Sequence, residues 1–230
     1  MTILVVSGTG TEIGKTITTA AVAALALAGG RSVAVLKPAQ TGVAPGEPGD
    51  VAEVRRLAGE AVTGAELARF PEPLAPNTSA RRAGMTPVGP AEVAEAAAKL
   101  ATEHDLVLVE GAGGLLVRFD DEGGTLADAA RLLGAPVLVV TPAGLGTLNS
   151  TALTGEALRA RDIEFAGVVV GSWPAEPDLA SRCNLADLPE SAGAPLLGTV
   201  PEGAGRLAPA DFRTRAAGWL APALGGVWSI

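Results

Sequence analysis

The sequence predicts a three-layer α/β fold, in which a mostly parallel central sheet lies between two layers of helices. Strand-length apolar runs alternate along the chain with helical segments rich in Ala, Leu and Glu, which is the order of a parallel α/β sheet. The apolar runs are mostly continuous and β-branched, as expected for strands buried on both faces. Aromatic residues make up only 3% of the chain and hydrophobic residues 48%, so the core must consist mainly of Ala, Val and Leu.

Each expected element follows from this alternation. The strand runs are Ile3–Ser7, Ser32–Leu36, Leu106–Val109, Val137–Thr141, Ala166–Val170 and Leu196–Val200. The helical segments are Lys15–Ala28, which Gly29 can end, then Asp50–Ala58, Pro90–Thr102, Leu126–Leu133 and Leu148–Arg159. The Pro- and Gly-rich stretch Thr41–Pro90 is expected to hold only loops and short helices. No fixed-period repeat or long linker interrupts the pattern, so residues 1–230 are expected to form one domain.

Composition excludes several classes of function. The chain has one His, His104, and one Cys, Cys183, so a Ser-His-Asp triad or a His/Cys zinc site is close to excluded. The formal net charge is −8 and no basic cluster exceeds a pair, so nucleic acid is not an expected partner. No apolar stretch of membrane-spanning length is free of charges or breaks, so no membrane partner is expected. The chain starts on a strand pattern with no basic signal-peptide segment, and its lone cysteine suits a reducing compartment, so a cytoplasmic location is expected.

The strongest local signal is Gly8-Thr9-Gly10-Thr11-Glu12-Ile13-Gly14-Lys15-Thr16, between the first strand and the first helix. Glycines let backbone N–H groups point at a phosphate, the helix N-terminus adds partial positive charge, and Lys15 supplies an ammonium. The Thr16 hydroxyl is placed to meet a Mg²⁺ bound to the phosphates. The strict motif would put a glycine at Thr9, so this is a lengthened variant. We therefore predict a P-loop NTPase-type fold, rather than a plain glycine-rich turn, with nucleotide contacts from Thr11, Glu12, Ile13, Gly14, Lys15 and Thr16.

The predicted nucleotide contacts of this loop end at Thr16. The next residue is Ile17, so no threonine hydroxyl is available at that position, and none of the nucleotide contacts is assigned to it.

At this loop the chain resembles the dethiobiotin synthetases, whose loop reads Gly-Thr-Asp-Thr-x-x-Gly-Lys-Thr with the same spacing. Gly10 stands where the family commonly has Asp. The resemblance continues in family order through blocks spread over most of the chain. These are Lys37-Pro38-Ala39-Gln40-Thr41-Gly42, Gly49-Asp50, Glu110-Gly111-Ala112-Gly113-Gly114, Leu145-Gly146-Thr147-Leu148-Asn149 and Pro201-Glu202-Gly203.

The resemblance implies a Mg-ATP-dependent cyclo-ligase of biotin biosynthesis. In that family, 7,8-diaminononanoate, CO₂ and Mg-ATP give dethiobiotin, ADP and phosphate. One amine takes up CO₂ as a carbamate, ATP phosphorylates the carbamate to a mixed anhydride, and the second amine attacks it to close a cyclic urea. The resemblance also implies a homodimer with the substrate near the subunit interface.

Lys37 follows the buried run Val33–Leu36 and precedes Pro38, so its side chain is expected to point into the ligand crevice. A carbamate anion and a transferring phosphoryl group both need a fixed cation, and Lys15 and Lys37 could hold donor and acceptor together. A strand-end lysine in solvent is the alternative, which the family match disfavours. Thr41 is then the expected hydroxyl donor to the carbamate or substrate. Lys37, Lys15 and Thr41 form the predicted catalytic set, and Thr11 is expected to contact substrate as well as nucleotide.

Glu110, Asp50 and Thr16 are the candidate Mg²⁺ ligands. Glu110 follows the run Leu106–Val109, at the strand end where P-loop proteins usually place a metal-binding carboxylate. Mg²⁺ prefers hard oxygen ligands and keeps several waters, so these residues with phosphate oxygens would suffice. From the residues alone, Asp50 could equally be the N-cap of the next helix, and the family match favours the metal.

Two glycine-rich segments are expected to contact the substrate. Gly111 and Gly114 let the backbone approach a ligand closely, although a flexible turn is the alternative. The second segment, Gly144–Asn149, leads from a strand into a helix, and the backbone N–H groups at that helix start suit an anion. By the resemblance, this segment reaches across the dimer to the carboxylate tail of the substrate. An ordinary N-cap by Thr147 or Asn149 is equally expected from the residues alone. The predicted contacts of this segment are Leu145, Gly146, Leu148 and Asn149.

The nucleobase is expected near Gly171 and Ser172, with Pro201, Glu202 and Gly203 as the other wall. The family often uses an Asn-containing segment after this strand, but Ser172-Trp173 stand in its place. An Asn side chain carries both a donor and an acceptor and can discriminate adenine. Its absence leaves the base preference open.

A nucleotide-switched partition or positioning ATPase is the alternative from another class. Those proteins usually carry a further lysine near the start of the phosphate loop, where this chain has Gly8-Thr9-Gly10. They also often show a basic DNA-binding surface or an amphipathic membrane tail, whereas the tail 216–222 is short and lacks a basic face. An amidoligase related to cobyrinate synthases would bring a glutaminase domain, whose Cys–His pair has no place here. The cyclo-ligase is the first prediction.

Overall fold

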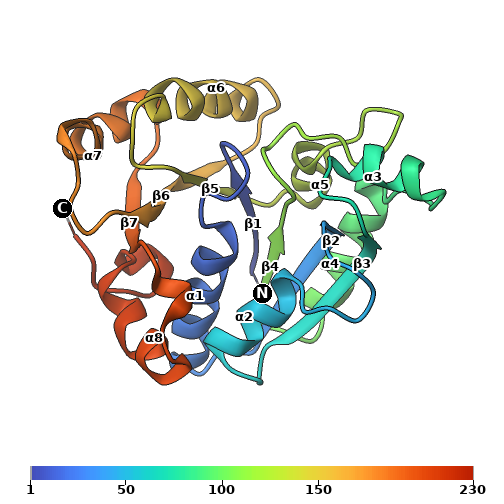
Figure 1. Ribbon diagram of the computed structural model, residues 1–230, viewed down its shortest axis with the longest axis horizontal. Coiled ribbons are helices and arrows are strands. Elements are labelled where there is room, and N and C mark those ends of the chain that lie inside the picture. The colour runs from blue at the N-terminus through green and yellow to red at the C-terminus, as the bar shows by residue number, and fades with distance from the viewer. Residues whose placement is uncertain (1, 230) are drawn as a thin grey trace.

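The computed structural model describes residues 2–229 and contains a seven-stranded sheet in the order β3-β2-β4-β1-β5-β6-β7 (Figure 1). Every neighbouring pair of strands is parallel. Met1 and Ile230, the ends of the predicted domain, lie outside the described residues. The strands are β1 (Thr2–Gly8), β2 (Val33–Thr41), β3 (Thr63–Phe70), β4 (Leu106–Glu110), β5 (Val137–Thr141), β6 (Phe165–Trp173) and β7 (Leu196–Pro201).

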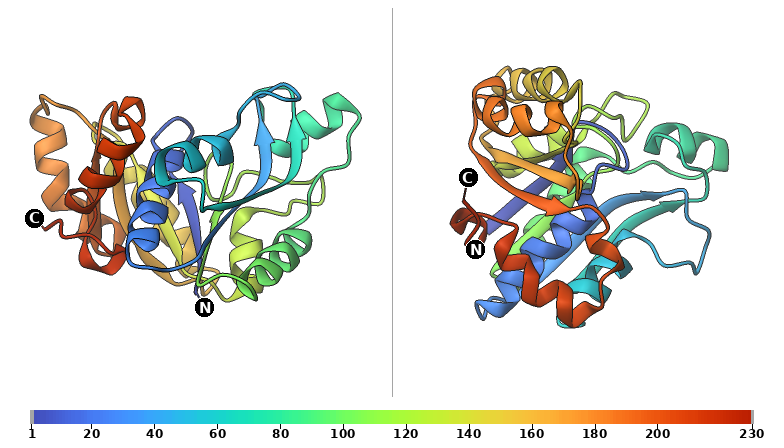
Figure 2. Two further views of the ribbon diagram at one scale, coloured as in Figure 1. Left: turned by 90° about the horizontal axis from the view of Figure 1, so that it is seen from below. Right: turned by 60° about the vertical axis from the view of Figure 1, so that its left-hand side comes forward.

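Helices cover both faces of the sheet, as predicted (Figures 1 and 2). Short 3₁₀ turns occupy Ala204–Arg206, Ala216–Gly218 and Pro222–Leu224. None of the helices within residues 2–229 is long and apolar enough to span a membrane. The α-helices are α1 (Lys15–Ala28), α2 (Asp50–Ala58), α3 (Pro76–Ala83), α4 (Pro90–Ala101), α5 (Leu126–Leu133), α6 (Thr147–Arg159), α7 (Leu179–Ala192) and α8 (Pro209–Arg215).

The two largest core clusters lie on opposite faces of the sheet, because successive side chains of a strand point to opposite faces. On β1, Leu4 packs into the core formed with α1, α2 and α8, and its neighbour Val5 packs into the core formed with α4 and α5. Phe212 of α8 belongs to the first core and lies edge-on to Trp219, with ring centroids 5.1 Å apart. The remaining core side chains are mostly Val, Leu and Ala, as the composition predicts.

The predicted strands and helices are all present, most of them with ends shifted by a few residues. The expectation of only loops and short helices between Thr41 and Pro90 is wrong at β3. This strand lies at the sheet edge, and most of its side chains are partly exposed, so it lacks the apolar run that identifies a central strand. Its sequence, Thr-Gly-Ala-Glu-Leu-Ala-Arg-Phe, forms a strand because β2 supplies a partner.

The predicted end of β2 at Leu36 is also corrected. The strand continues through Lys37 and Pro38 to Thr41, but only its first half has two neighbours. Pairing with β4 stops at Leu36, whereas pairing with β3 continues to Thr41. The sheet therefore opens at Lys37, between β2 and β4, and this opening creates the crevice described next.

Candidate functional site

The segment 8–16 forms a turn that leaves the carboxyl end of β1 and leads directly into α1. Gly14 is the N-cap of α1 with a φ of 92°, a conformation that side chains disfavour. A Cβ at Gly14 would also lie 2.1 Å from the Gly171 carbonyl oxygen on β6, so the loop approaches β6 too closely for any side chain. Lys15, in the first turn of α1, is buried and donates its ammonium to the Gly10 carbonyl at 2.7 Å.

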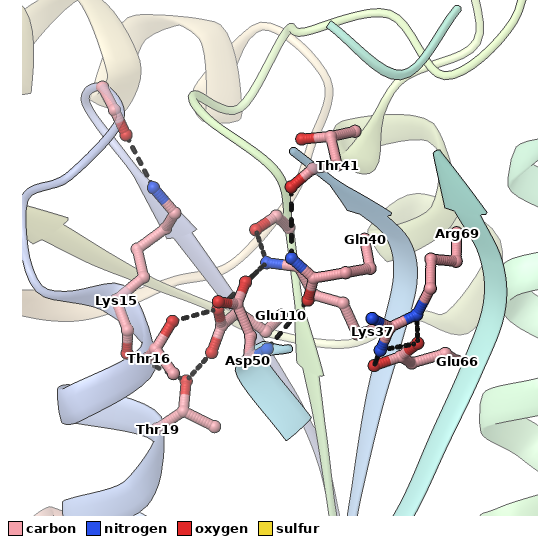
Figure 3. A network of polar contacts seen from close by, with 12 residues as sticks. Lys15, Thr16, Thr19, Lys37, Gln40, Thr41, Asp50, Glu66, Arg69 and Glu110 are labelled. Atoms are coloured by element: carbon pink, nitrogen blue, oxygen red, sulfur yellow. Dashed lines mark hydrogen bonds and ion pairs between the residues drawn. The ribbon is translucent and has the colours of Figure 1, made fainter. Parts of the chain in front are cut away.

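Lys37 is at the centre of a buried ion cluster (Figure 3). Its Nζ lies 2.5 Å from Asp50 Oδ2 and 3.0 Å from Glu110 Oε1, and it donates to the Gly111 carbonyl at 2.9 Å. An ammonium has three N–H donors, so all the donors of Lys37 have partners. The interpretation of Asp50 as an N-cap is wrong, because the N-cap of α2 is Gly49 and the Asp50 carboxylate contacts Lys37.

Glu110 joins β4 to α1. Its carboxylate is buried, with an exposed fraction of 1%, and both of its oxygens have partners. Oε1 accepts from the Thr16 hydroxyl at 2.8 Å, and Oε2 accepts from the Thr19 hydroxyl at 2.7 Å. Together with Lys37, these hydroxyls stabilise a charge that burial alone would penalise.

The two lysines differ in their electrostatics. Burial, and then the positive charge of Lys37, lower the pKa of Lys15 from 10.5 to about 8, against the attraction of Glu110 and Asp50. Burial also acts against the charged form of Lys37, but Glu110 and Asp50 together outweigh it and raise the pKa of Lys37 above its ordinary value. Lys37 therefore stays an ammonium at neutral pH, and Lys15 is the lysine whose charge responds to mildly alkaline conditions.

A cavity of about 820 Å³ opens above this cluster. Part of its wall is formed by residues 73–76, which lead from the bend after β3 into the first residue of α3. The cavity brings together side chains that start from four separate places on the sheet edge, as expected at the carboxyl ends of parallel strands. The predicted site residues that line it are Thr11, Glu12, Ile13, Gly14, Lys15, Thr16, Lys37, Thr41, Asp50 and Glu110.

Ile17, directly after the phosphate loop, lines the cavity as well, although no nucleotide contact is assigned to it from the sequence. Its side chain is partly buried and packs against the core formed with α1, α2 and α8. A Cβ at Gly205 would lie 2.7 Å from its Cδ1, so the segment after β7 approaches it closely. Ile17 therefore adds an apolar patch to the cavity wall and no hydroxyl.

The glycine segment after β4 lines the cavity through Ala112 and Gly113, rather than through the predicted contacts Gly111 and Gly114. Gly111 packs against α5, because a Cβ added at Gly111 would lie 2.5 Å from Leu126 Cδ2. A Cβ at Gly114 would lie 3.4 Å from the Gly8 carbonyl oxygen. Both glycines therefore let the segment pack closely, and Gly111 also gives its carbonyl to Lys37.

The segment with Leu145, Gly146, Leu148 and Asn149 does not line this cavity. It forms the turn from β5 into α6, and Leu145 at its tip is 89% exposed. Capping by Thr147 or Asn149 is wrong, because the N-cap is Gly146 and no side chain caps the helix. The Thr147 hydroxyl instead meets Thr141 Oγ1 at 2.6 Å, in a buried group of hydroxyls on β5 and α6.

The two predicted walls of the base site lie next to each other. Trp173 pairs with Pro201 in the sheet, and the Glu202 N–H donates to the Trp173 carbonyl at 2.7 Å. Gly171 touches the phosphate loop at Gly14. Gly171 is thus beside the start of α1, and the cavity that holds Lys37 is lined by none of the predicted base contacts Gly171, Ser172, Pro201, Glu202 and Gly203.

Sequence reasoning missed three contributors to the site. Thr19 bonds Glu110, and its position one turn after Thr16 on the same helix face was the available signal. Gln40 lines the cavity and is 4% exposed, and a buried amide at a strand end was its signal. The wall at residues 73–76 gave no signal, because its proline-rich sequence resembles any loop. Within residues 2–229 there is no group of three or more His, Cys, Asp or Glu suited to a metal, so an ion here would need further oxygens.

Comparison with known proteins gives a consistent family. A family model described as "AAA domain" matches residues 2–205. The chain is 75% identical to the ATP-dependent dethiobiotin synthetase BioD of Streptomyces avermitilis, over 99% of this chain and 95% of that protein. It is 71% identical to the protein of the same name from Saccharopolyspora erythraea, over the full length of both.

The solved structures that it resembles are more distant. The ParA family ATPase of Chlorobium tepidum aligns with a TM-score of 0.60 at 14% identity, over 97% of this chain and 94% of that one. The MinD cell division protein in the MinC:MinD complex of Aquifex aeolicus aligns with a TM-score of 0.59 at 15% identity, over 94% and 86% of the two chains. At this identity the likeness shows a shared P-loop fold and does not favour a partition or positioning role.

Proposed function

The chain belongs to the family of ATP-dependent dethiobiotin synthetases, and we propose that the cavity above Lys37 is where it closes the cyclic urea of dethiobiotin. The reaction joins CO₂ to 7,8-diaminononanoate at the expense of ATP, a step of biotin biosynthesis. One observation carries the proposal: Lys15 of α1 and Lys37 of β2 line one cavity, with Thr41 on its wall. Phosphoryl transfer depends mainly on holding donor and acceptor together and on neutralising charge.

We propose that the phosphates of the nucleotide bind at residues 11–16. The N-terminus of α1 supplies unpaired backbone N–H groups there, and Lys15 would exchange its bond to the Gly10 carbonyl for a phosphate oxygen. The base would then lie near Ser172 and residues 201–203. The side chain at position 172 is a single hydroxyl, which can make fewer specific contacts with a base than an amide can.

Lys37 is the proposed cation for the carbamate and for the phosphoryl group that the carbamate accepts. Its raised pKa keeps it charged, and its fixed contacts with Asp50 and Glu110 hold it in place before substrate arrives. Thr41 is the proposed donor to the carbamate or to the substrate. Thr11, which also lines the cavity, would contact both substrates.

Mg²⁺ is the proposed cofactor, and the donor set fits it. Thr16, Asp50 and Glu110 offer hydroxyl and carboxylate oxygens to one cavity, which is the hard chemistry that Mg²⁺ prefers. Protein oxygens alone would not complete its coordination, so phosphate oxygens and water would supply the rest. When bound, the ion neutralises charge on the phosphates.

We further propose that residues 1–230 act as one domain and assemble as a homodimer. Leu145 and Leu153, at the turn before α6 and on that helix, are 89% and 57% exposed, and such apolar side chains suit a partner surface. Uncapped N–H groups at the start of α6 would then meet the carboxylate of substrate bound to the partner. Small molecules are the proposed ligands, with neither nucleic acid nor membrane, and the single cysteine supports a cytoplasmic location.

The test is phosphate release from Mg-ATP in the presence of bicarbonate, with and without 7,8-diaminononanoate. We expect release to require the diamine and to match dethiobiotin formation mole for mole. If phosphate release did not depend on the diamine, the protein would be an ATPase without ring-closing activity, and the partition or positioning ATPase would be favoured. Light scattering on the same sample measures the mass, and a monomer would contradict the dimer.

A further inference from the structure

Gln40 is the only glutamine in the chain, and it is buried at the edge of the cavity. Its Oε1 accepts a hydrogen bond from the backbone N–H of Asp50 at 2.8 Å (Figure 3). Asp50 is the first residue of α2, and the N-cap Gly49 makes no capping bond of its own. The first N–H groups of a helix have no partner inside it. Gln40 therefore caps α2 from the neighbouring strand and fixes the backbone that carries the Asp50 carboxylate.

Gly49 is the residue that makes this contact sterically possible. Its φ of −103° is open to any residue, so its conformation does not require glycine. Its surroundings do: a Cβ at position 49 would lie 2.7 Å from Gln40 Oε1 and 3.0 Å from Arg69 Nη2. The Gln40 amide from β2 and the Arg69 guanidinium from β3 thus fill the space that a side chain at position 49 would need.

Arg69, on the edge strand β3, holds the same loop from its other side. Its Nη1 donates to the Glu47 carbonyl at 2.7 Å. Its Nε and Nη2 bond the carboxylate of Glu66 at 3.0 and 2.8 Å, so the guanidinium is itself held in place (Figure 3). The loop 43–49 is mostly exposed, and these contacts connect it to the sheet.

We propose that Gln40 and Arg69 are positioning residues that hold Asp50 where it meets Lys37 and the Mg-nucleotide. The inference rests on the proposed function for the role of Asp50. The Asp50 side chain is 34% exposed, yet its carboxylate lies 2.5 Å from a lysine that is 4% exposed. A carboxylate at the end of an exposed loop would otherwise sample several positions, and fixing it in advance lowers the entropy cost of each binding event.

A double-mutant cycle between Gln40→Met and Asp50→Asn tests the proposal. The readout is the ratio of ATP affinities with Mg²⁺ and with EDTA, measured by calorimetry, so turnover is not needed. Gln40→Met removes the acceptor for the Asp50 N–H and should lower this ratio about tenfold, the effect of losing one good hydrogen bond. The backbone N–H is unchanged by Asp50→Asn. A positioning effect should therefore vanish in the Asn background, whereas a merely structural effect would persist there.

Arg69→Ala, which frees the loop from its other side, should also lower the ratio, and it carries the test alone if Gln40→Met does not fold. Arg82→Ala is the matched control, because Arg82 bonds Glu72 in a similar but exposed pair that makes no bond to Asp50 or to the loop 43–49, and it should leave the ratio unchanged. Equal losses from Gln40→Met in both backgrounds would overturn the positioning role and leave the proposed function intact. A wild-type ratio for Asp50→Asn would remove Asp50 from the metal site and overturn the positioning role as well, while ring closure would still be tested by phosphate release with the diamine.

Discussion

Replacing Lys37 by methionine separates the structural role of this lysine from its catalytic role. The substitution keeps the length of the side chain and removes the ammonium that contacts Asp50, Glu110 and the Gly111 carbonyl. Glu110 is then a buried carboxylate with only two hydroxyl donors left, those of Thr16 and Thr19. Breaking one side of a buried ion pair costs about 3 to 5 kcal/mol, so we expect the free energy of unfolding to fall by about that amount.

Turnover should fall much further than stability. Loss of a preorganised cation at the reacting groups costs about 10²- to 10³-fold in rate. The affinity for nucleotide should stay within about tenfold, because the phosphate loop and Lys15 are untouched. Urea unfolding of the ligand-free protein gives the first quantity, dethiobiotin formation gives the second, and calorimetry with ATP gives the third.

The double variant Lys37→Met/Glu110→Gln is the control for folding. It removes both charges, and the glutamine can still bond the hydroxyls of Thr16 and Thr19. We expect it to recover at least half of the lost stability and none of the lost turnover. Full turnover in Lys37→Met, or turnover that returns together with stability in the double variant, would refute the catalytic role of Lys37.

Three further predictions test other parts of the site. The free-protein pKa of Lys15 is about 8, lowered by burial and by Lys37, so its ammonium is complete below that pH and is lost above it. Affinity for ATP should therefore be constant up to about pH 8 and fall about tenfold by about pH 9, and a flat titration would contradict this. Gly14→Ala places a Cβ 2.1 Å from the Gly171 carbonyl and should abolish ATP binding in calorimetry, whereas Gly218→Ala, which meets nothing within 4 Å, should bind normally. Thr141→Val removes the hydroxyl shared with Thr9, Thr147 and Thr151 and should cost about 1 to 3 kcal/mol in urea unfolding, with a smaller loss for Thr141→Ser, and equal losses would show that the methyl group matters instead.

Local patterns in the sequence determined the central strands, most of the helices and the phosphate loop. Strands buried on both faces need continuous β-branched runs, and a phosphate loop needs glycines and Lys15 at a fixed spacing before a helix. Each of these two patterns is contained within a short stretch of sequence, so it can be recognised without knowing the tertiary structure. The bounds of α1, α2, α5 and β5 agree with those expected for the same reason.

The tertiary structure decided which direct contacts the clustered side chains make with one another. The Thr16–Glu110 bond joins residues 94 apart, and the Lys37–Glu110 contact joins residues 73 apart. Neither separation leaves a periodic trace in the sequence, because it depends on the order in which the strands assemble. The edge strand β3 became a strand through its pairing with β2, and with it came Arg69 and the anchored loop before Asp50. Hydrophobic periodicity records burial, and partly exposed polar contacts between distant segments leave no such record.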